Sequence, residues 1–216
     1  CPKCLHRLAW FNLIPIISYL FQRGKCSYCY APISAQYPLV EAAAGVAAAW
    51  LIHFHGASWI AIHEIGLVFF LIVIFVTDWR FQEVHDLHVI LALLWTIGWQ
   101  MIFRTSGPAL AGAGLGLFFS IAIYAFASWQ YGRPVFGFGD VTLSTLIGAI
   151  VGWSYFFPVY ILALVLHILF ALIRTMVLKT LGNGATFHDL IPFGPPLILS
   201  CGIFPLSAAF FRRSIM

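Results

Sequence analysis

The chain has 216 residues, of which 62% are hydrophobic and only 8% are charged, and its formal net charge is +4 at pH 7. A soluble globular domain is roughly 45–50% apolar and about 25% charged. The composition therefore excludes a soluble enzyme, a disordered chain and a nucleic-acid-binding protein, and it is typical of an integral membrane protein.

The first 37 residues differ from the rest because they hold four of the five cysteines. These form two C-x2-C pairs, Cys1 with Cys4 and Cys26 with Cys29, separated by 21 residues. Two thiolates at this spacing can bind one side of a tetrahedral metal ion, and a second pair completes the coordination. Cytoplasmic thiols stay reduced, which favours a closed, structural zinc site over the alternative of two disulfides.

From residue 38 onwards the chain is a series of apolar runs separated by Gly, Pro and polar residues. A helix that spans a bilayer needs about 20 predominantly apolar residues, with a range of about 17–25. We predict an all-α polytopic membrane protein, with a cytoplasmic zinc-binding module over residues 1–37 and a transmembrane domain over residues 38–216. The fifth span is short: Phe157 and Pro158 mark a break near its end, and Gly148 and Gly152 leave open where it ends. About seven spans are expected, over residues 38–54, 58–77, 87–103, 108–130, 140–154, 156–178 and 190–211.

The placement of Lys and Arg predicts the orientation, because these residues are enriched in cytoplasmic loops. With the cysteine module in the cytoplasm, eight basic residues lie on that side and three on the other. The cytoplasmic group is Lys3, Arg7, Arg23, Lys25, Arg80, Arg133, Arg174 and Lys179, and the opposite group is Arg104, Arg212 and Arg213.

Two of the seven acidic residues are expected at the cytoplasmic ends of different spans. Asp78 ends a long apolar run, and Asp140 follows Gly137-Phe138-Gly139 at the start of another. Two carboxyl groups that meet cannot both ionise, so one can activate a water while its protonated partner polarises a peptide carbonyl. Gly137 and Gly139 would let the backbone turn and would support an extended peptide substrate. The alternative is that both acids are ordinary helix-end residues, with Asp140 as an N-cap.

Three further residues have simpler interpretations. Glu64 is expected to pair with the adjacent His63 near the outer membrane surface. Asp86 is expected to cap the helix that starts at Leu87. Cys201, in an apolar stretch, is expected to be an inert core thiol.

Six motifs follow one another along nearly the whole chain. They are the two cysteine pairs, residues 12–20, the segments 31–34 and 37–41 together, residues 78–86, the G-F-G-D sequence at 137–140, and I-P-F-G-P at 191–195. In this order they resemble the type IV prepilin peptidases, membrane aspartic proteases that process type IV prepilins and type II secretion pseudopilins. Two positions depart from the family pattern: His85 stands where a Pro is usual, and Thr142 stands where a Lys is common.

The resemblance implies that Asp78 and Asp140 are the catalytic acids and that the four N-terminal cysteines bind zinc. It implies cleavage of a short basic leader at the cytoplasmic face of the bacterial inner membrane, with prepilins and the lipid bilayer as partners and no nucleic acid. Many members also methylate the new N-terminus, so S-adenosylmethionine is a second expected cofactor where that activity is retained.

Another class of function remains open from the residues alone. A polytopic ion-coupled transporter or channel would also hold acids within apolar segments, facing a cavity near the middle of the bilayer. The position of Asp78 and Asp140 at the ends of apolar runs favours the peptidase.

Overall fold

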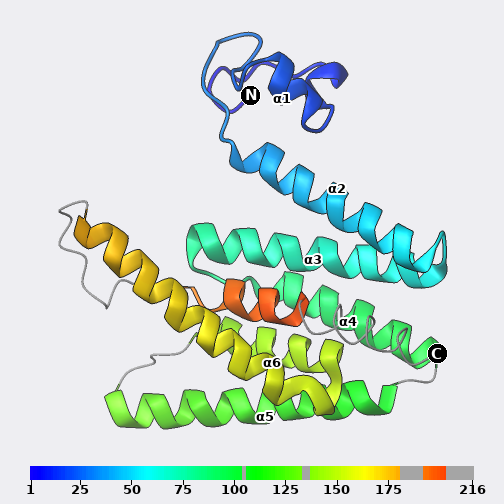
Figure 1. Cartoon of the computed structure of the whole chain (residues 1–216), viewed down its shortest axis with the longest axis vertical. Coiled ribbons are helices and arrows are strands. Elements are labelled where there is room, and N and C mark those ends of the chain that lie inside the picture. The colour runs from blue at the N-terminus through cyan, green and yellow to red at the C-terminus, as the bar shows by residue number, and fades with distance from the viewer. Residues whose placement is uncertain (104–105, 133–136, 181–191, 203–216) are drawn as a thin grey trace. The chain divides into compact units, whose positions relative to one another are not determined.

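The computed structural model describes residues 1–103, 106–132, 137–180 and 192–202. Within these residues the regular elements are helices, and one isolated antiparallel bridge joins Lys25 to Pro32. A further helical segment covers residues 194–202. The named elements are η1 (Trp10–Leu13), α1 (Ile17–Phe21), α2 (Gln36–His55), α3 (Trp59–Phe81), α4 (Asp86–Ile102), α5 (Ser106–Tyr131) and α6 (Phe138–Thr180) (Figure 1).

The chain divides into two compact units, Cys1–Ile72 and Val73–Met216, with the division inside α3. The first unit holds the cysteines and α2, and the second holds α4, α5 and α6. The boundary expected between residues 37 and 38 divides the chain by polarity, whereas these two units are defined by compactness. The expected domain boundary therefore stays a prediction.

Four helices are long and apolar enough to cross a membrane, namely α2, α3, α5 and α6, and α4 is a shorter apolar helix. Many large apolar side chains on these helices are exposed, as lipid-facing residues are. The chain is therefore an all-helical membrane protein in its described part. The spans expected over residues 38–54, 58–77, 87–103 and 108–130 correspond to α2, α3, α4 and α5.

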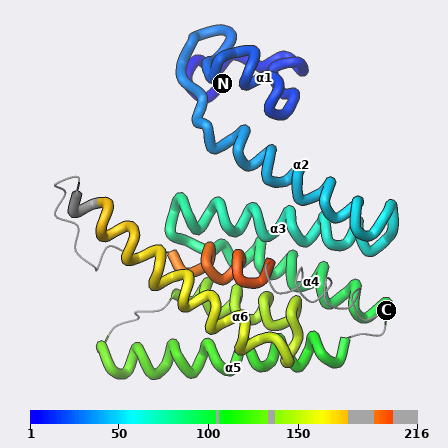
Figure 2. The backbone as a smooth tube through the Cα atoms, in the orientation of Figure 1, coloured from blue at the N-terminus to red at the C-terminus, as the bar shows by residue number. Residues whose placement is uncertain are grey.

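Within α6 the expected fifth and sixth spans are two helical parts that meet in a kink at Gly152, two residues before the expected end of the fifth span. This glycine has φ 72° and ψ 172°, a conformation that few other residues adopt, and the two parts of α6 run in different directions (Figure 2). The expected break at Phe157 and Pro158 is wrong, because Pro158 lies inside the helix. Membrane helices tolerate such a proline when neighbouring groups satisfy the freed carbonyl.

The expected seventh span, residues 190–211, is described only at residues 192–202, so the total of seven spans stays a prediction. This short helical segment begins at Gly194, whose backbone N–H contacts the Asp78 carboxyl.

The first part of α6 packs tightly against α5 through small residues. A Cβ at Gly112 would overlap the carbonyl oxygen of Gly148, and a Cβ at Gly116 would overlap that of Ser144. Small residues spaced four apart allow membrane helices to approach closely, where van der Waals contact replaces the hydrophobic effect. This close packing fixes the part of α6 that carries Asp140.

Candidate active site and cysteine cluster

Asp78 lies one turn before the C-terminal end of α3 and is only 4% exposed. Its Oδ2 accepts a hydrogen bond from the backbone N–H of Gly194 at 3.0 Å. A Cβ at Gly194 would overlap this same oxygen and would lie 3.1 Å from Cδ2 of Leu143. The site therefore requires a glycine at position 194, and this contact joins two segments 116 residues apart.

The position of Gly194 is set by the residue before it. The ring of Phe193 lies 5.7 Å from that of Tyr160 and 5.6 Å from that of His167, centroid to centroid, and both partners belong to α6. Gly194 is also the first residue of the 194–202 helical segment. Free N–H groups and the positive end of the helix dipole therefore face the Asp78 carboxyl.

Asp140 lies in the first turn of α6. Its Oδ2 accepts a hydrogen bond from the backbone N–H of Gly137 at 3.3 Å, and its own N–H donates to the carbonyl oxygen of Gly137 at 3.1 Å. This is the reciprocal geometry in which an acidic side chain at the third helical position satisfies the free N–H before the helix. Asp140 thus follows the N-cap position rather than occupying it, and its carboxyl is only partly exposed.

Gly139 is confined by the loop that connects α3 to α4. A Cβ at this position would lie 2.7 Å from Cβ of Val84 and 2.9 Å from its carbonyl oxygen. Both glycines that the sequence singled out therefore support the turn around Asp140. Gly137 donates to the carboxyl, and Gly139 allows the loop to pass close to the helix.

The carboxyl groups of Asp78 and Asp140 belong to helices that meet at Gly194, where an added Cβ would overlap Oδ2 of Asp78 and lie 3.1 Å from Cδ2 of Leu143, one turn after Asp140. They come from the end of one helix and the start of another, as the sequence indicated. Two carboxyl groups that meet at such a junction can share one proton, so that one acts as a base and the other as an acid. The arrangement suits addition of water to a peptide carbonyl without a covalent intermediate.

Tyr160 is buried beside Ser144, which lies one turn after Asp140, and was not anticipated from the sequence. It is 3% exposed, its hydroxyl is 3.5 Å from Oγ of Ser144, and Ser144 donates to the carbonyl oxygen of Asp140 at 2.7 Å. A tyrosine inside an apolar run carries no signal of its own. Asp140 and Tyr160 are 20 residues apart, so a straight helix would hold them about 30 Å apart. The kink at Gly152 lets them approach.

Glu64 pairs with a different histidine from the one expected. Its Oε2 lies 3.0 Å from Nε2 of His55, at the end of α2. His63 is adjacent to Glu64 in the same helix, and consecutive helical side chains point in directions about 100° apart. The turn between α2 and α3 instead brings His55 opposite Glu64.

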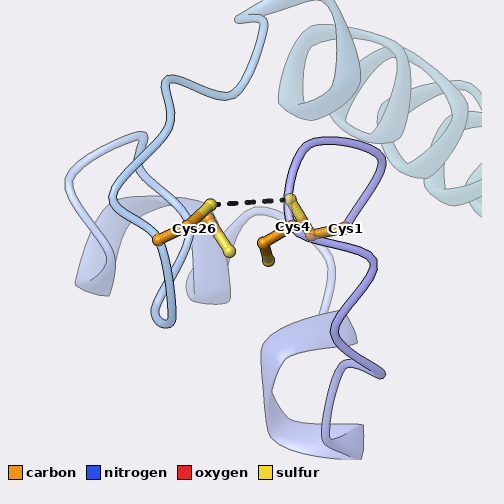
Figure 3. A group of neighbouring side chains, drawn as sticks. Cys1, Cys4 and Cys26 are labelled. Carbon is orange, nitrogen blue, oxygen red and sulfur yellow. Dashed lines mark hydrogen bonds between the residues drawn. The ribbon is translucent and has the colours of Figure 1, made fainter.

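The four N-terminal cysteines gather at one point, as the sequence predicted. All four Sγ atoms lie within 4.8 Å of one another, and Sγ of Cys1 is 3.9 Å from Sγ of Cys29. Cys1, Cys4 and Cys26 turn toward a common centre (Figure 3). Zinc bound by four thiolates at about 2.3 Å places neighbouring sulfurs roughly 3.8 Å apart, so this cluster fits a tetrahedral ion closely. The cluster can bind a metal ion.

One thiol of the second cysteine pair, Cys26, is prepared for metal binding by the backbone around it. The backbone N–H groups of Cys29 and Tyr28 hydrogen-bond to the Cys26 sulfur and lower the pKa of this thiol to about 7. The thiolate is the form that binds metal. Hydrogen bonds of 2.9 Å from the N–H of Cys26 to Ala31 and from the N–H of Tyr30 to Cys26 close the turn that holds this pair.

Polar side chains tie the cysteine turn to the rest of the first unit. Oδ1 of Asn12 accepts hydrogen bonds from Gln22 at 3.0 Å and from Ser27 at 3.1 Å. Oε2 of Glu41, in α2, accepts one from the backbone N–H of Ile16 at 2.7 Å. Asn12 and Glu41, which lie in two of the motifs shared with the resembling family, therefore hold the first unit together here.

Comparison with known proteins gives matches along most of the chain. Residues 1–55 match the family model of the bacterial peptidase A24 N-terminal domain, and residues 65–172 match that of the type IV leader peptidase family. No solved structure matches the chain.

Curated relatives carry the name prepilin leader peptidase/N-methyltransferase. The one from Stutzerimonas stutzeri is 35% identical and covers 93% of this chain and 68% of its own length. The one from Neisseria gonorrhoeae gives the same three values, and the one from Burkholderia pseudomallei is 32% identical over 90% of this chain and 62% of its own length. The chain thus spans about two thirds of these relatives. The matches do not support the alternative of an ion-coupled transporter.

Proposed function

This chain belongs to the type IV leader peptidase family, and we propose that it cleaves the leader peptides of type IV prepilins and type II secretion pseudopilins with Asp78 and Asp140 as its catalytic pair. The observation that carries this assignment is the placement of the two acids at helix ends that meet beside Gly194, whose N–H contacts Asp78 and whose Cα lies close to Leu143, one turn after Asp140. Each carboxyl also has a backbone N–H donor, from Gly194 and from Gly137.

The reaction follows from a carboxyl pair that shares one proton. The ionised carboxyl accepts a proton from water as the water oxygen bonds to the scissile carbonyl carbon. The protonated carboxyl donates its proton to the carbonyl oxygen, which gives a tetrahedral diol. The C–N bond then breaks as the leaving nitrogen takes a proton, and a carboxylic acid and a free amine result. No bond forms between protein and substrate.

We place the reaction at the cytoplasmic face of the bacterial inner membrane. The support is the predicted excess of Lys and Arg on the side that holds the Asp78 end of α3. The apolar N-terminal segment of the substrate would lie in the bilayer, and its leader would reach the carboxyl pair from the cytoplasm.

We assign the cysteine cluster to a structural zinc ion. Four sulfur ligands leave no open position for water or substrate, so such an ion stabilises the fold and takes no part in peptide cleavage. The residues that would hold it are Cys1, Cys4, Cys26 and Cys29.

N-methylation of the new N-terminus with S-adenosylmethionine is the second activity in the relatives' names. We treat it as a separate proposal. Mass spectrometry of the cleaved product tests it, because retained methylation adds one methyl group that depends on added S-adenosylmethionine.

The peptidase assignment is tested with purified protein and a prepilin substrate. Asp78→Asn and Asp140→Asn should each abolish cleavage while the protein remains in the membrane fraction. Glu83→Gln is the matched control, because it removes an exposed carboxylate from the loop that connects α3 to α4 and should leave cleavage unchanged. Full activity in either Asp variant would overturn the assignment.

A further inference from the structure

The loop between α3 and α4 and the first residue of α4 contact the start of α6 on both sides of Asp140. On one side Val84 lies against Gly139, with no space for a side chain there. On the other side the hydroxyl of Thr142 lies 3.0 Å from Oδ1 of Asp86. These contacts bracket the residue that carries the second carboxyl of the candidate pair.

The bond between Thr142 and Asp86 differs from the other hydroxyl contacts of α6. Thr145 donates only to the carbonyl oxygen of Val141, one turn earlier in its own helix. The Thr142 hydroxyl lies 3.0 Å both from the carbonyl oxygen of Gly139, in its own helix, and from the carboxylate of Asp86, in another, so these two acceptors share its single hydrogen. It therefore joins α6 to α4.

Asp86 does not cap α4, contrary to the expectation from the sequence. The N-cap of this helix is His85, and Asp86 is its first residue. Its carboxylate instead accepts the bond from Thr142. At this position it is also close to the N-terminal ends of both α4 and α6, where the helix dipoles favour a negative charge.

The consequence concerns the distance between the two catalytic carboxyls. Asp78 precedes Asp86 by eight residues, across the end of α3 and a short loop. Asp140 precedes Thr142 by two residues in the first turn of α6. The hydrogen bond between Thr142 and Asp86 therefore links the segment that follows Asp78 to the segment that carries Asp140.

We propose that the Thr142–Asp86 hydrogen bond is a positioning contact that sets the separation of the Asp78 and Asp140 carboxyls for catalysis. The proposal rests on the peptidase function proposed above. It assigns a role to position 142, at which this sequence departs from the lysine common in the resembling family.

The test compares Thr142→Val, which keeps the shape but loses the hydroxyl, with Thr142→Ser, which keeps the hydroxyl. A misplacement of catalytic groups by about 1 Å can cost up to roughly a hundredfold in rate. We expect Thr142→Val to lower kcat for prepilin cleavage by about tenfold or more with little change in KM. Thr142→Ser should stay close to the unsubstituted protein, and Thr145→Val is the matched control that should leave kcat unchanged.

A double-mutant cycle separates positioning from other roles. If Thr142 and Asp86 act through one contact, Asp86→Ala combined with Thr142→Val should be no slower than the slower single variant. The pH dependence of kcat should also change in Thr142→Val, because a new carboxyl separation changes how the pair shares its proton. Loss of thermal stability in detergent without a change in kcat or in its pH profile would indicate a merely structural contact and overturn the proposal.

Two further results would also overturn it. The first is full activity in Thr142→Val. The second is a raised KM in Asp86→Ala, together with losses of the two single variants that multiply in the double variant. This result would make Asp86 a substrate-binding residue. Both leave the peptidase assignment intact as long as Asp78→Asn and Asp140→Asn are inactive. Activity in those two variants would instead contradict the proposed function itself.

Discussion

The backbone N–H of Gly194 donates a hydrogen bond of 3.0 Å to Oδ2 of Asp78, in a space that admits no Cβ. The contact joins the end of α3 to the start of the 194–202 helical segment. It supplies the buried Asp78 carboxyl with a hydrogen-bond donor, which a group only 4% exposed needs in either protonation state.

Gly194→Ala should therefore lower cleavage sharply, because the new methyl group displaces either the Asp78 carboxyl or the N–H that contacts it. Gly202→Ala is the control in the same helical segment, where a Cβ would meet nothing within 4 Å. The measurement is the initial rate of prepilin cleavage per mole of purified protein. Equal rates for the two variants would show that the Gly194 contact has no part in the reaction.

Gly148→Ala should destabilise the second unit. Its methyl group would overlap the backbone of Gly112, which cannot rotate away as a side chain can. Overpacking of this kind costs about 1–3 kcal/mol. Gly114→Ala, on α5 but with open space around it, should change stability little. Thermal unfolding in detergent compares the two, and a midpoint for Gly148→Ala at or above that of Gly114→Ala would contradict the close helix packing.

Zinc affinity of the cysteine cluster should depend on pH around neutrality. Because backbone N–H groups lower the pKa of Cys26 to about 7, its thiolate is present above that pH and is lost as the pH falls through about 7. Protons then compete with the metal for the sulfur. Competition with a chromophoric chelator should show weaker zinc binding at pH 6 than at pH 8.

The matched comparison for this cluster is Cys26→Ser against Cys201→Ala. Cys201 is buried outside the cluster, so its loss should leave the zinc content at about one ion per chain, as four sulfur ligands allow. Cys26→Ser should lose most of the bound zinc. Equal zinc content in both variants would place the metal elsewhere.

The sequence predicted the parts of the site that lie within short motifs. The C-x2-C pairs predicted a cysteine cluster, and the placement of Asp78 and Asp140 at the ends of apolar runs predicted two carboxyls at helix ends. Both predictions depend on local spacing and on the cost of placing charge within lipid. The structure brings the four sulfurs together and places the two acids at helix ends, and their pairing in catalysis stays a prediction.

Other features depend on tertiary contacts that local patterns do not contain. The contact of Gly194 with Asp78 spans 116 residues, and only the I-P-F-G-P motif marked that segment at all. Pro158 does not break α6, and the kink lies at Gly152, where φ is 72°. The partner of Glu64 is His55, across a turn, rather than its neighbour His63.

The most direct test of the carboxyl pair is the single-turnover rate of prepilin cleavage by Asp78→Asn, Asp140→Asn and the variant with both changes. Residues that act as one catalytic unit have strongly non-additive effects. We predict no detectable cleavage by either single variant. If a residual rate can be measured, the double variant should cleave no more slowly than the slower single variant. Substantial cleavage by either single variant, or losses that multiply in the double variant, would contradict a shared role for Asp78 and Asp140.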